Sequence, residues 1–234
     1  MQNKPQLFCL TYAGGSAEFY DVIRDSVTGV EVVSLEYSGH GTRRKEPFYN
    51  DFAELADDLY EEIKKRRNGE AYGLFGYSMG SISLVEILKR ILDRKEISPP
   101  VSLFIAAHKP LSWREFHRVS SDGLDEWARN RTIQFGAVPE KLMENKSFWR
   151  MYLPLYRADY SLIGRYRFEE MPLRTDIPAH IFYSETDTAY EDMKLWKHIF
   201  TGECAFHRFE GNHFFIRQHY AEISQIILAA MGRS

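Results

Sequence analysis

The sequence predicts an α/β fold in which a mostly parallel β-sheet is flanked by helices. Three observations support this prediction. Short, wholly apolar runs alternate with amphipathic helical patterns along most of the chain, which is typical of parallel sheets covered by helices. One apolar run passes through Gly-Tyr-Ser-Met-Gly at residues 76–80 directly into a helical pattern. Between about 108 and 171 the alternation stops, and amphipathic helical fragments replace it.

The apolar runs mark the expected strands, at residues 7–10, 31–35, 72–77, 101–107, 179–183 and 204–209. Because residues 7–10 are apolar throughout rather than alternating, we expect a strand that is buried on both faces there. Helical patterns lie at residues 16–27, 52–63, 82–91, 193–200 and 214–228. Asp51 is the expected N-cap of the second helix. A chain of 234 residues can bury one sizeable core, so residues 1–234 are expected to form a single domain.

The stretch without strands, about 108–171, is predicted to be a helical lid inserted over the carboxyl ends of the strands. Six of its aromatic residues could line an acyl-binding pocket: Trp113, Trp127, Trp149, Tyr152, Tyr156 and Tyr160. The alternative for each of them is that it only holds the lid on the core.

The composition argues against several classes of protein. The net charge of −3 gives no electrostatic reason to expect nucleic acid or an acidic membrane surface as a partner. We find no run of 18 apolar residues and no apolar leader. Cys9 and Cys204 lie in apolar runs, which indicates buried thiols in a reducing compartment. We therefore expect a cytoplasmic protein with neither nucleic-acid nor membrane partners.

The motif at residues 76–80 has the form of a nucleophile elbow. In such a turn the central residue, here Ser78, lies at a strained junction of strand and helix that exposes its hydroxyl group. Gly76 and Gly80 let the two backbones pass close together. The helix start directs unpaired N–H groups at the reacting centre, so the Met79 N–H is a candidate oxyanion donor. The second donor is expected from the loop after the first strand, and Ala13 is the residue that we assign.

A serine hydroxyl needs a base that removes its proton as it attacks. Among the eight histidines, His213 follows a strand in a Gly-flanked turn and precedes a helix, which makes it the candidate base. His40, in a Gly-rich loop at another strand end, is the main competitor.

The imidazole in turn needs a carboxylate that fixes its tautomer. Asp187 follows a strand in an exposed turn and is assigned this role, with Glu185 and Asp192 as nearby rivals. The order Ser, Asp, His along the chain is that of α/β-hydrolases, so the predicted fold is the α/β-hydrolase fold with a helical lid. These groups predict acyl transfer through an acyl-serine intermediate, and the sequence suggests no metal site.

Four separated motifs resemble the type II thioesterases that accompany nonribosomal peptide and polyketide synthetases. The first strand with its loop at 7–17, the Gly-rich loop at 39–47, the lid segment at 153–160 and the histidine motif at 211–215 match in the same order. Two departures stand out, because Thr11 occupies the place of a usual Pro, and Glu-Tyr-Ser at 36–38 replaces a Leu-Pro-Gly-like sequence.

The resemblance implies an editing enzyme that hydrolyses acyl or aminoacyl groups from the phosphopantetheine thiol of carrier protein domains. It implies no cofactor of the enzyme's own, because the phosphopantetheine belongs to the partner, and we expect a monomer. Arg157 and Asp159 are interpreted as residues that pair within the lid, without a catalytic role. The alternatives are a medium-chain acyl thioesterase or carboxylesterase, and a non-catalytic subunit that binds carrier domains.

Overall fold

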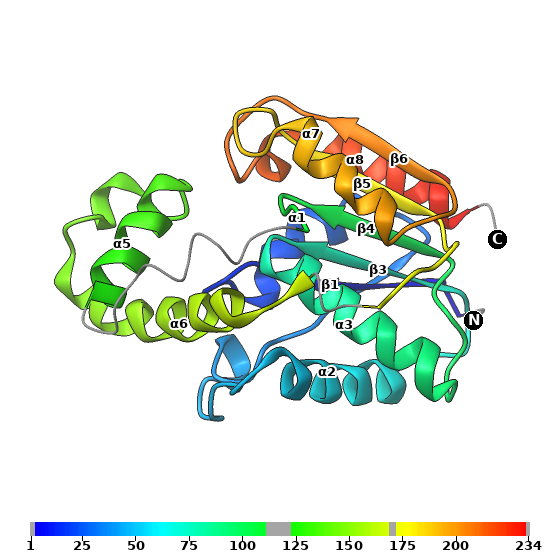
Figure 1. The fold of residues 1–234 in the computed structure, drawn as a ribbon, viewed down its shortest axis with the longest axis horizontal. Coiled ribbons are helices and arrows are strands. Elements are labelled where there is room, and N and C mark those ends of the chain that lie inside the picture. Colours follow the sequence, from blue (N-terminus) through cyan, green and yellow to red (C-terminus); the bar gives the residue numbers. More distant parts are fainter. Residues whose placement is uncertain (1–2, 111–122, 169–171, 233–234) are drawn as a thin grey trace.

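The computed structural model describes residues 3–110, 123–168 and 172–232. A six-stranded sheet in the order β2-β1-β3-β4-β5-β6 crosses the centre of the molecule, and every neighbouring pair is parallel (Figure 1). The strands are β1 (Gln6–Leu10), β2 (Glu31–Ser34), β3 (Tyr72–Tyr77), β4 (Ser102–Ala106), β5 (Ala179–Tyr183) and β6 (Cys204–Arg208). The predicted parallel α/β fold is therefore confirmed, and each expected strand is present.

Two apolar cores lie on the two faces of the sheet, because alternate residues of each strand point to opposite faces. In β1, Phe8 and Leu10 belong to the core that contains α2 (Phe52–Arg66) and α3 (Met79–Arg94). Leu7 and Cys9 belong to the core that contains α1 (Asp21–Arg24) and α8 (Ile216–Met231). Both faces of the sheet are thus covered, which explains why the central strands are apolar throughout.

One cysteine departs from the prediction. Cys9 lies in the buried strand β1, but Cys204 is partly exposed because β6 is an edge strand whose residues are half-covered. The expectation of two buried thiols is wrong for Cys204. Both cysteines are free.

The helix boundaries show where local sequence decides and where it does not. The Asp51 side chain accepts a hydrogen bond of 2.8 Å from the Glu54 N–H, so it is the N-cap of α2 as predicted. The pattern at 16–27 gives only a short 3₁₀ turn (Ala17–Tyr20) and one turn of helix in α1, and Ser16 makes no side-chain cap. Apolar spacing alone predicted a longer helix there.

The region at 193–200 is similar, with α7 (Tyr190–Met193) continuing into a 3₁₀ stretch (Lys194–His198). The last helix, α8, begins at Ile216, two residues later than predicted. The residues before it form a tight turn, in which the Phe214 N–H donates to the Asn212 side chain and the Phe215 N–H to the Asn212 carbonyl.

Between β4 and β5 the described residues form α5 (Leu124–Gln134), a 3₁₀ turn (Glu140–Leu142) and α6 (Lys146–Arg165), without a strand. We call residues 123–168 the α5–α6 segment. Figure 1 shows it projecting to one side of the sheet, the side on which α3 begins. The predicted residue Trp113 lies outside the described residues.

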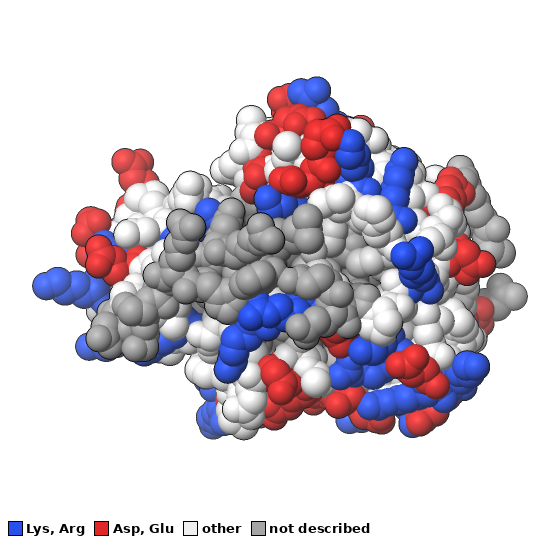
Figure 2. Space-filling model, in the orientation of Figure 1, with Lys and Arg blue, Asp and Glu red and all other residues white. Residues whose placement is uncertain are grey.

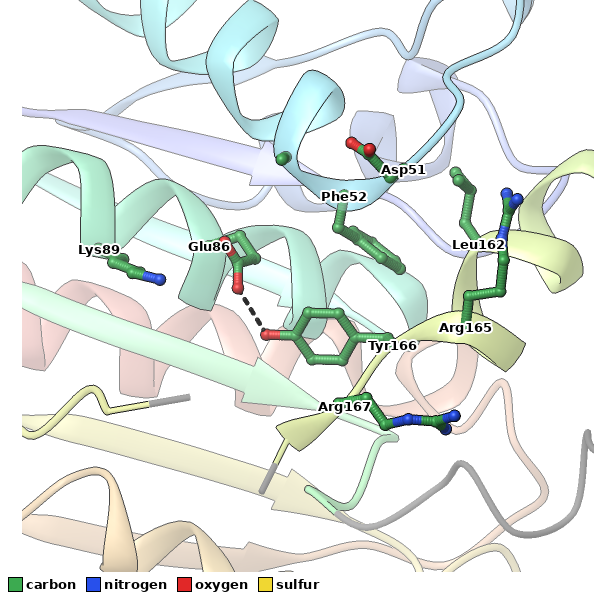
Figure 3. A pocket seen from close by; sticks show the side chains of 9 residues that line it. Asp51, Phe52, Glu86, Lys89, Leu162, Arg165, Tyr166 and Arg167 are labelled. Atoms are coloured by element: carbon green, nitrogen blue, oxygen red, sulfur yellow. Dashed lines mark hydrogen bonds between the residues drawn. The ribbon is translucent and has the colours of Figure 1, made fainter. Parts of the chain in front are cut away.

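The end of α6 is anchored on α2 and α3 beside a surface pocket of about 330 Å³ (Figure 3). The Tyr166 hydroxyl donates to Glu86 of α3 at 2.9 Å, and its ring packs edge-on against Phe52 of α2. The Arg165 guanidinium donates to the Asn50 carbonyl at 2.7 Å. These contacts fix the carboxyl end of α6 relative to the sheet.

Two further features bear on the predictions. On the face drawn in Figure 2, acidic and basic side chains occur together over the described surface rather than in separate halves. Among the helices in the described ranges, none combines the length and apolarity that crossing a membrane requires.

Candidate active site

Ser78 lies between β3 and α3 with φ 54° and ψ −115°, a left-handed conformation that non-glycine residues rarely adopt. The turn is sharp enough that a Cβ atom on Gly76 would lie 2.3 Å from the Gly80 carbonyl oxygen. A Cβ atom on Gly80 would lie 2.0 Å from the Leu10 carbonyl oxygen at the end of β1. Both glycines are therefore required by close backbone contacts, and the first turn of α3 lies against the loop that follows β1.

The Ser78 hydroxyl, the His213 ring and the Asp187 carboxylate form one hydrogen-bonded series. His213 Nε2 is 3.0 Å from Ser78 Oγ, and His213 Nδ1 is 2.9 Å from each Asp187 oxygen. Because a carboxylate only accepts hydrogen bonds, Nδ1 carries the proton and Nε2 is free to accept the one from Ser78. The structure thus brings together the three side chains that the sequence singled out.

Neighbouring loops at the carboxyl edge of the sheet support this series. Ser184 and Thr186, in the turn that carries Asp187, both donate to the Gly211 carbonyl, two residues before His213. The Tyr77 hydroxyl donates to the His213 carbonyl at 2.5 Å. The sequence analysis missed these three supporting side chains, although two of them stand in the same polar turn as Asp187.

The rivals of His213 and Asp187 are bound elsewhere. His40 is buried against Asp159, at 2.9 Å from its carboxylate. Asp192 pairs with Lys109 at 2.9 Å, and Glu185 accepts a long hydrogen bond from the Tyr190 N–H. None of these contacts involves Ser78 or His213.

A further histidine lies at the same edge of the sheet. His108 follows β4, and burial lowers its pKa to about 4. The ring is therefore neutral at pH 7 and adds no charge beside the Asp187 carboxylate. Its backbone carbonyl accepts a hydrogen bond of 2.8 Å from the Trp196 indole.

The loop after β1 forms a tight turn over residues 12–15. The Gly15 N–H donates to the Tyr12 carbonyl at 3.0 Å, and Gly14 has φ 74°. A positive φ at the third position is the signature of a type II turn, in which glycine is strongly preferred. Ala13 occupies the second position. Across the elbow, Met79 is the first residue of α3, so its N–H belongs to the turn that has no intrahelical acceptor.

Residues of the α5–α6 segment cover both sides of this centre. A Cβ atom on Gly14 would lie 2.1 Å from the Tyr156 ring, so α6 packs directly on the turn. The Phe135 ring, at the end of α5, stacks on the His213 imidazole with a centroid distance of 4.1 Å. Ser78 and His213 are left only 9% and 6% exposed. Phe135 was not among the aromatic residues that the sequence analysis selected.

The other predicted pocket residues that the structure describes contact neighbours within the α5–α6 segment. Trp149 donates to the Met143 carbonyl at 2.7 Å. The Trp127 and Tyr160 rings meet edge to face, and Tyr152 stacks on Phe148.

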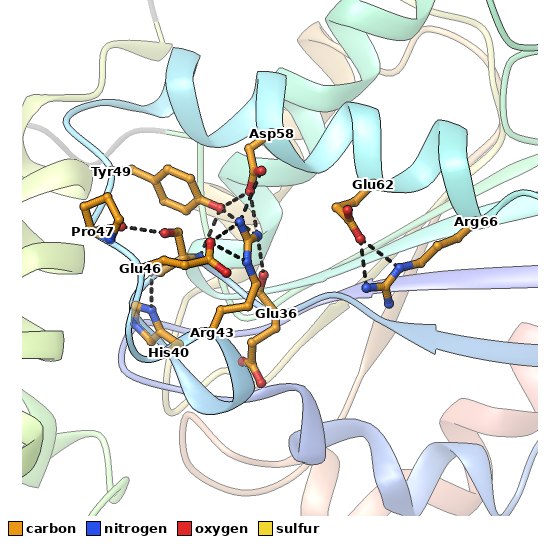
Figure 4. Close-up of polar contacts among 10 residues, drawn as sticks. Glu36, His40, Arg43, Glu46, Pro47, Tyr49, Asp58, Glu62 and Arg66 are labelled. Carbon is orange, nitrogen blue, oxygen red and sulfur yellow. Dashed lines mark hydrogen bonds and ion pairs between the residues drawn. The ribbon is translucent and has the colours of Figure 1, made fainter.

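The Gly-rich loop at 38–47 is fixed by charged contacts (Figure 4). Arg43 pairs with Glu46 within the loop and with Asp58 of α2. Glu36, one of the departures from the resembling family, accepts from the Ala17 and Thr42 N–H groups and so ties two loops together.

The remaining departures contact each other. The Tyr37 hydroxyl donates to the Thr11 carbonyl at 2.9 Å and is 3.1 Å from the Ser83 hydroxyl. A hydrogen bond between two of the unusual residues therefore joins the two loops, and the bonds among Ser78, His213 and Asp187 are present beside it. Within the described residues, we find no cluster of three or more His, Cys, Asp or Glu side chains that could hold a metal ion.

The sequence profile of the thioesterase domain family matches residues 5–231. The chain belongs to the thioesterase family. The resemblance read from the motifs is thereby confirmed, and the predicted enzyme class, a hydrolase of thioesters, is that of the family. The identification covers nearly the whole chain rather than the elbow alone.

Known thioesterases are similar to this chain over most of its length. The medium-chain S-acyl fatty acid synthase thioesterase of Rattus norvegicus is 29% identical over 221 residues, which cover 90% of this chain and 81% of the relative. The solved structure of ClbQ from the colibactin NRPS/PKS pathway superimposes with a TM-score of 0.86 at 24% identity, covering 99% and 98% of the two chains. The type II thioesterase BorB from the borrelidin biosynthetic cluster gives 0.81 at 28% identity, covering 99% and 94%.

Proposed function

We propose that this protein is a type II, editing thioesterase, which hydrolyses acyl or aminoacyl thioesters from the phosphopantetheine arm of carrier proteins in a nonribosomal peptide or polyketide synthetase. The observation that carries the proposal is the hydrogen-bonded series of Ser78, His213 and Asp187 at a nucleophile elbow. Two relatives support the pathway, since ClbQ comes from an NRPS/PKS pathway and BorB is a type II thioesterase of a biosynthetic cluster.

The geometry supports a two-step reaction. As Ser78 Oγ bonds to the thioester carbon, its proton passes to His213 Nε2, and the Asp187 carboxylate stabilises the resulting imidazolium. The carbonyl oxygen becomes an oxyanion, for which the Ala13 and Met79 N–H groups are the proposed donors. When the C–S bond breaks, the His213 imidazolium gives its proton to the leaving thiolate sulfur, which departs as the thiol. Water then repeats the attack on the acyl-Ser78 ester and releases the acid.

The α5–α6 segment is the proposed lid. Because Ser78 and His213 are less than a tenth exposed beneath it, an acyl group on a long arm must be admitted by a movement of that segment. The partner in this proposal is a carrier protein domain in the cytoplasm, which supplies the phosphopantetheine. The enzyme itself acts as a monomer and uses no metal or cofactor.

A second candidate is a medium-chain acyl thioesterase. It is favoured by the 29% identity with the Rattus norvegicus medium-chain enzyme across four fifths of that relative. A general carboxylesterase would use the same three side chains. The third alternative, a non-catalytic subunit that binds carrier domains, would not need the hydrogen bond between Ser78 and His213.

The proposal is tested by intact mass spectrometry of a carrier domain loaded with acetyl-, aminoacyl- or decanoyl-phosphopantetheine. Each is incubated with the wild-type protein and with Ser78→Ala, and decanoyl-CoA is tested in parallel. We expect rapid loss of acetyl and aminoacyl groups with the wild type alone. Preference for decanoyl groups from either carrier would favour the medium-chain alternative. Persistence of every acyl group with both proteins would overturn hydrolysis and support the binding subunit.

A further inference from the structure

We propose that Asp159, held in place by His40, is a positioning residue for the oxyanion hole, because it fixes the turn that presents the Ala13 N–H. The inference rests on the proposed function, in which Ala13 is an oxyanion donor. The sequence analysis paired Asp159 with Arg157 and treated His40 as a rival base. In the structure Asp159 bonds to His40, and Arg157 pairs with Asp125 instead.

The contact joins three distant parts of the chain. Asp159 Oδ2 accepts hydrogen bonds from the Gly14 N–H at 2.6 Å and from His40 Nε2 at 2.9 Å. Asp159 lies in α6 and is 2% exposed. A carboxylate buried to this degree is stable only where hydrogen bonds and an opposite charge compensate it. The turn and the Gly-rich loop provide both.

The hydrogen bond to Gly14 selects the conformation of the turn. Type I and type II turns differ by a flip of the peptide between the second and third positions, here Ala13 and Gly14. The Gly14 N–H belongs to that peptide, so its bond to Asp159 holds the type II form, in which Gly14 has φ 74°. The Tyr12 carbonyl is meanwhile held by the Gly15 N–H. Because the peptide is planar and trans, fixing the Tyr12 carbonyl also fixes the direction of the Ala13 N–H.

The His40 ring is a cation, and its charge compensates the Asp159 carboxylate. Its Nδ1 lies 3.0 Å from the Ser38 carbonyl and its Nε2 faces Asp159, so both ring nitrogens face acceptors and both carry protons. Burial lowers the pKa of His40, but the Asp159 carboxylate, the Ser38 carbonyl and Glu36 together raise it, and the net pKa lies above its ordinary value. The Arg43 contacts with Glu46 and Asp58 fix the loop that carries this ring (Figure 4).

In the arrangement seen here, with the α5–α6 segment over the serine, Asp159 is held by contacts on both sides of it along the chain. One turn earlier on α6, the Tyr156 ring covers Gly14, and beyond its carboxyl end Tyr166 is bound to Glu86 (Figure 3). The carboxylate can therefore hold the turn in a fixed position relative to the sheet. Loss of one oxyanion donor lowers kcat by about 10²–10³-fold, so a residue that only orients a donor should have a smaller effect, of roughly 10–100-fold.

The test compares Asp159→Ala with Glu144→Ala. Glu144 is a matched control, because it is a carboxylate of the same segment whose side chain is 89% exposed. The readouts are kcat and KM for an acetyl-carrier thioester, and Ki for an acyl trifluoromethyl ketone, which forms a tetrahedral adduct with the serine. For Asp159→Ala we expect kcat to fall about 10–100-fold, KM to stay within about threefold, and Ki to rise in proportion to the loss in kcat/KM. Glu144→Ala should match the wild type.

A second pair of variants keeps the test decisive if Asp159→Ala does not fold. Asp159→Asn keeps an acceptor for the Gly14 N–H but loses the charge, and His40→Gln leaves the carboxylate without its cation. Both should lower kcat about 3–10-fold, with the same proportional rise in Ki. Unchanged kcat in folded variants, or a fall in kcat without a rise in Ki, would overturn the positioning role.

The same experiment separates this inference from the proposed function. If the wild type cleaves p-nitrophenyl butyrate but no carrier thioester, the proposed function fails, and Asp159 is then judged on the ester and on Ki. If the wild type cleaves carrier thioesters while the folded Asp159 variants are as active, the function stands and the positioning role fails.

Discussion

The two sides of Ser78 are built from different parts of the molecule. On the base side, Asp187 and His213 follow the adjacent strands β5 and β6, and their loops are joined to each other through the Gly211 carbonyl. On the oxyanion side, the turn after β1 is held by Asp159, from α6. The hydrogen bonds of the base side therefore come from loops that follow the strands, with only the Phe135 ring added from the α5–α6 segment, whereas the oxyanion side is hydrogen-bonded to α6 itself.

Because of this difference, the two sides should respond differently to a movement of the α5–α6 segment. A movement of the α5–α6 segment that admits a substrate would leave the bonds among Ser78, His213 and Asp187 in place. The same movement would release the Gly14 N–H from Asp159. We therefore expect the base to be ready at all times and the oxyanion hole to be completed when the segment returns, which would link full activity to closure.

The largest effect is expected at Ser78, which both sides serve. Ser78→Ala removes the nucleophile and should lower kcat by about 10⁴-fold or more without unfolding the protein, because the hydroxyl makes no core contact. Steady-state kinetics and a thermal melt would measure this. Retention of wild-type activity would show that neither side has been assigned correctly.

Asp187→Asn tests the base side. The amide can present its N–H to His213 Nδ1 and so favour the wrong tautomer, and the rate should fall by up to about 10⁴-fold. Glu185→Gln is the matched control, since Glu185 bonds to the Tyr190 N–H instead. Normal kinetics for Asp187→Asn together with an inactive Glu185→Gln would reassign the acid.

Gly14→Ala tests the oxyanion side. The new methyl group would meet the Tyr156 ring at 2.1 Å, so the turn and α6 must move apart, and kcat should fall about 10²-fold. Gly29→Ala is the control, because Gly29 also has a positive φ, of 92°, but nothing lies within 4 Å of the added atom. Both variants should lose roughly 1 kcal/mol of stability from backbone strain. Equal kcat values for the two would show that the turn tolerates displacement.

A smaller effect is expected at Phe135, where the α5–α6 segment reaches the base side. Phe135→Leu removes the ring that stacks on His213, and an aromatic pair of this kind contributes about 0.5–1.5 kcal/mol, which corresponds to a roughly 2–12-fold loss in kcat/KM. Phe148→Leu removes a stacked ring within α6 instead and should match the wild type. A loss as large as that of Gly14→Ala would mean that the base side also depends on the segment.

The smallest effect is expected at the cysteines, which belong to neither side. Burial raises the pKa of Cys204 to about 11, so at pH 7 roughly one thiol in 10⁴ is ionised, and buried Cys9 is less accessible still. Brief treatment with N-ethylmaleimide at pH 7 should leave activity unchanged and add little mass to the protein. Parallel loss of activity and gain of mass would implicate a thiol.

The two sides also differ in how far the sequence predicts them. Ser78 stands directly after an apolar run, and Asp187 and His213 stand in turns that follow two others. Because parallel strands place their carboxyl ends together, local pattern and general topology were enough. Asp159 could not be assigned in this way. A helical pattern shows which face of α6 is apolar, but not which loop the helix meets, and Gly14 lies 145 residues earlier in the chain.

Other misses have the same origin. Phe135 reaches His213 only because of how α5 is oriented, and Cys204 is partly exposed only because β6 has one neighbour. Both facts depend on the arrangement of whole elements rather than on residues nearby in sequence. The helix predicted after Ser16 is shorter than expected, and the expected cap does not form.

The backbone conformation of Ser78 lowers the stability of the folded protein. Its φ of 54° is readily adopted by glycine and disfavoured for serine by about 1–2 kcal/mol, so Ser78→Gly should melt at a higher temperature than the wild type. A population of such chains under selection for stability alone would drift away from the nucleophile. Stabilising designs for this protein should therefore leave residue 78 out of their search.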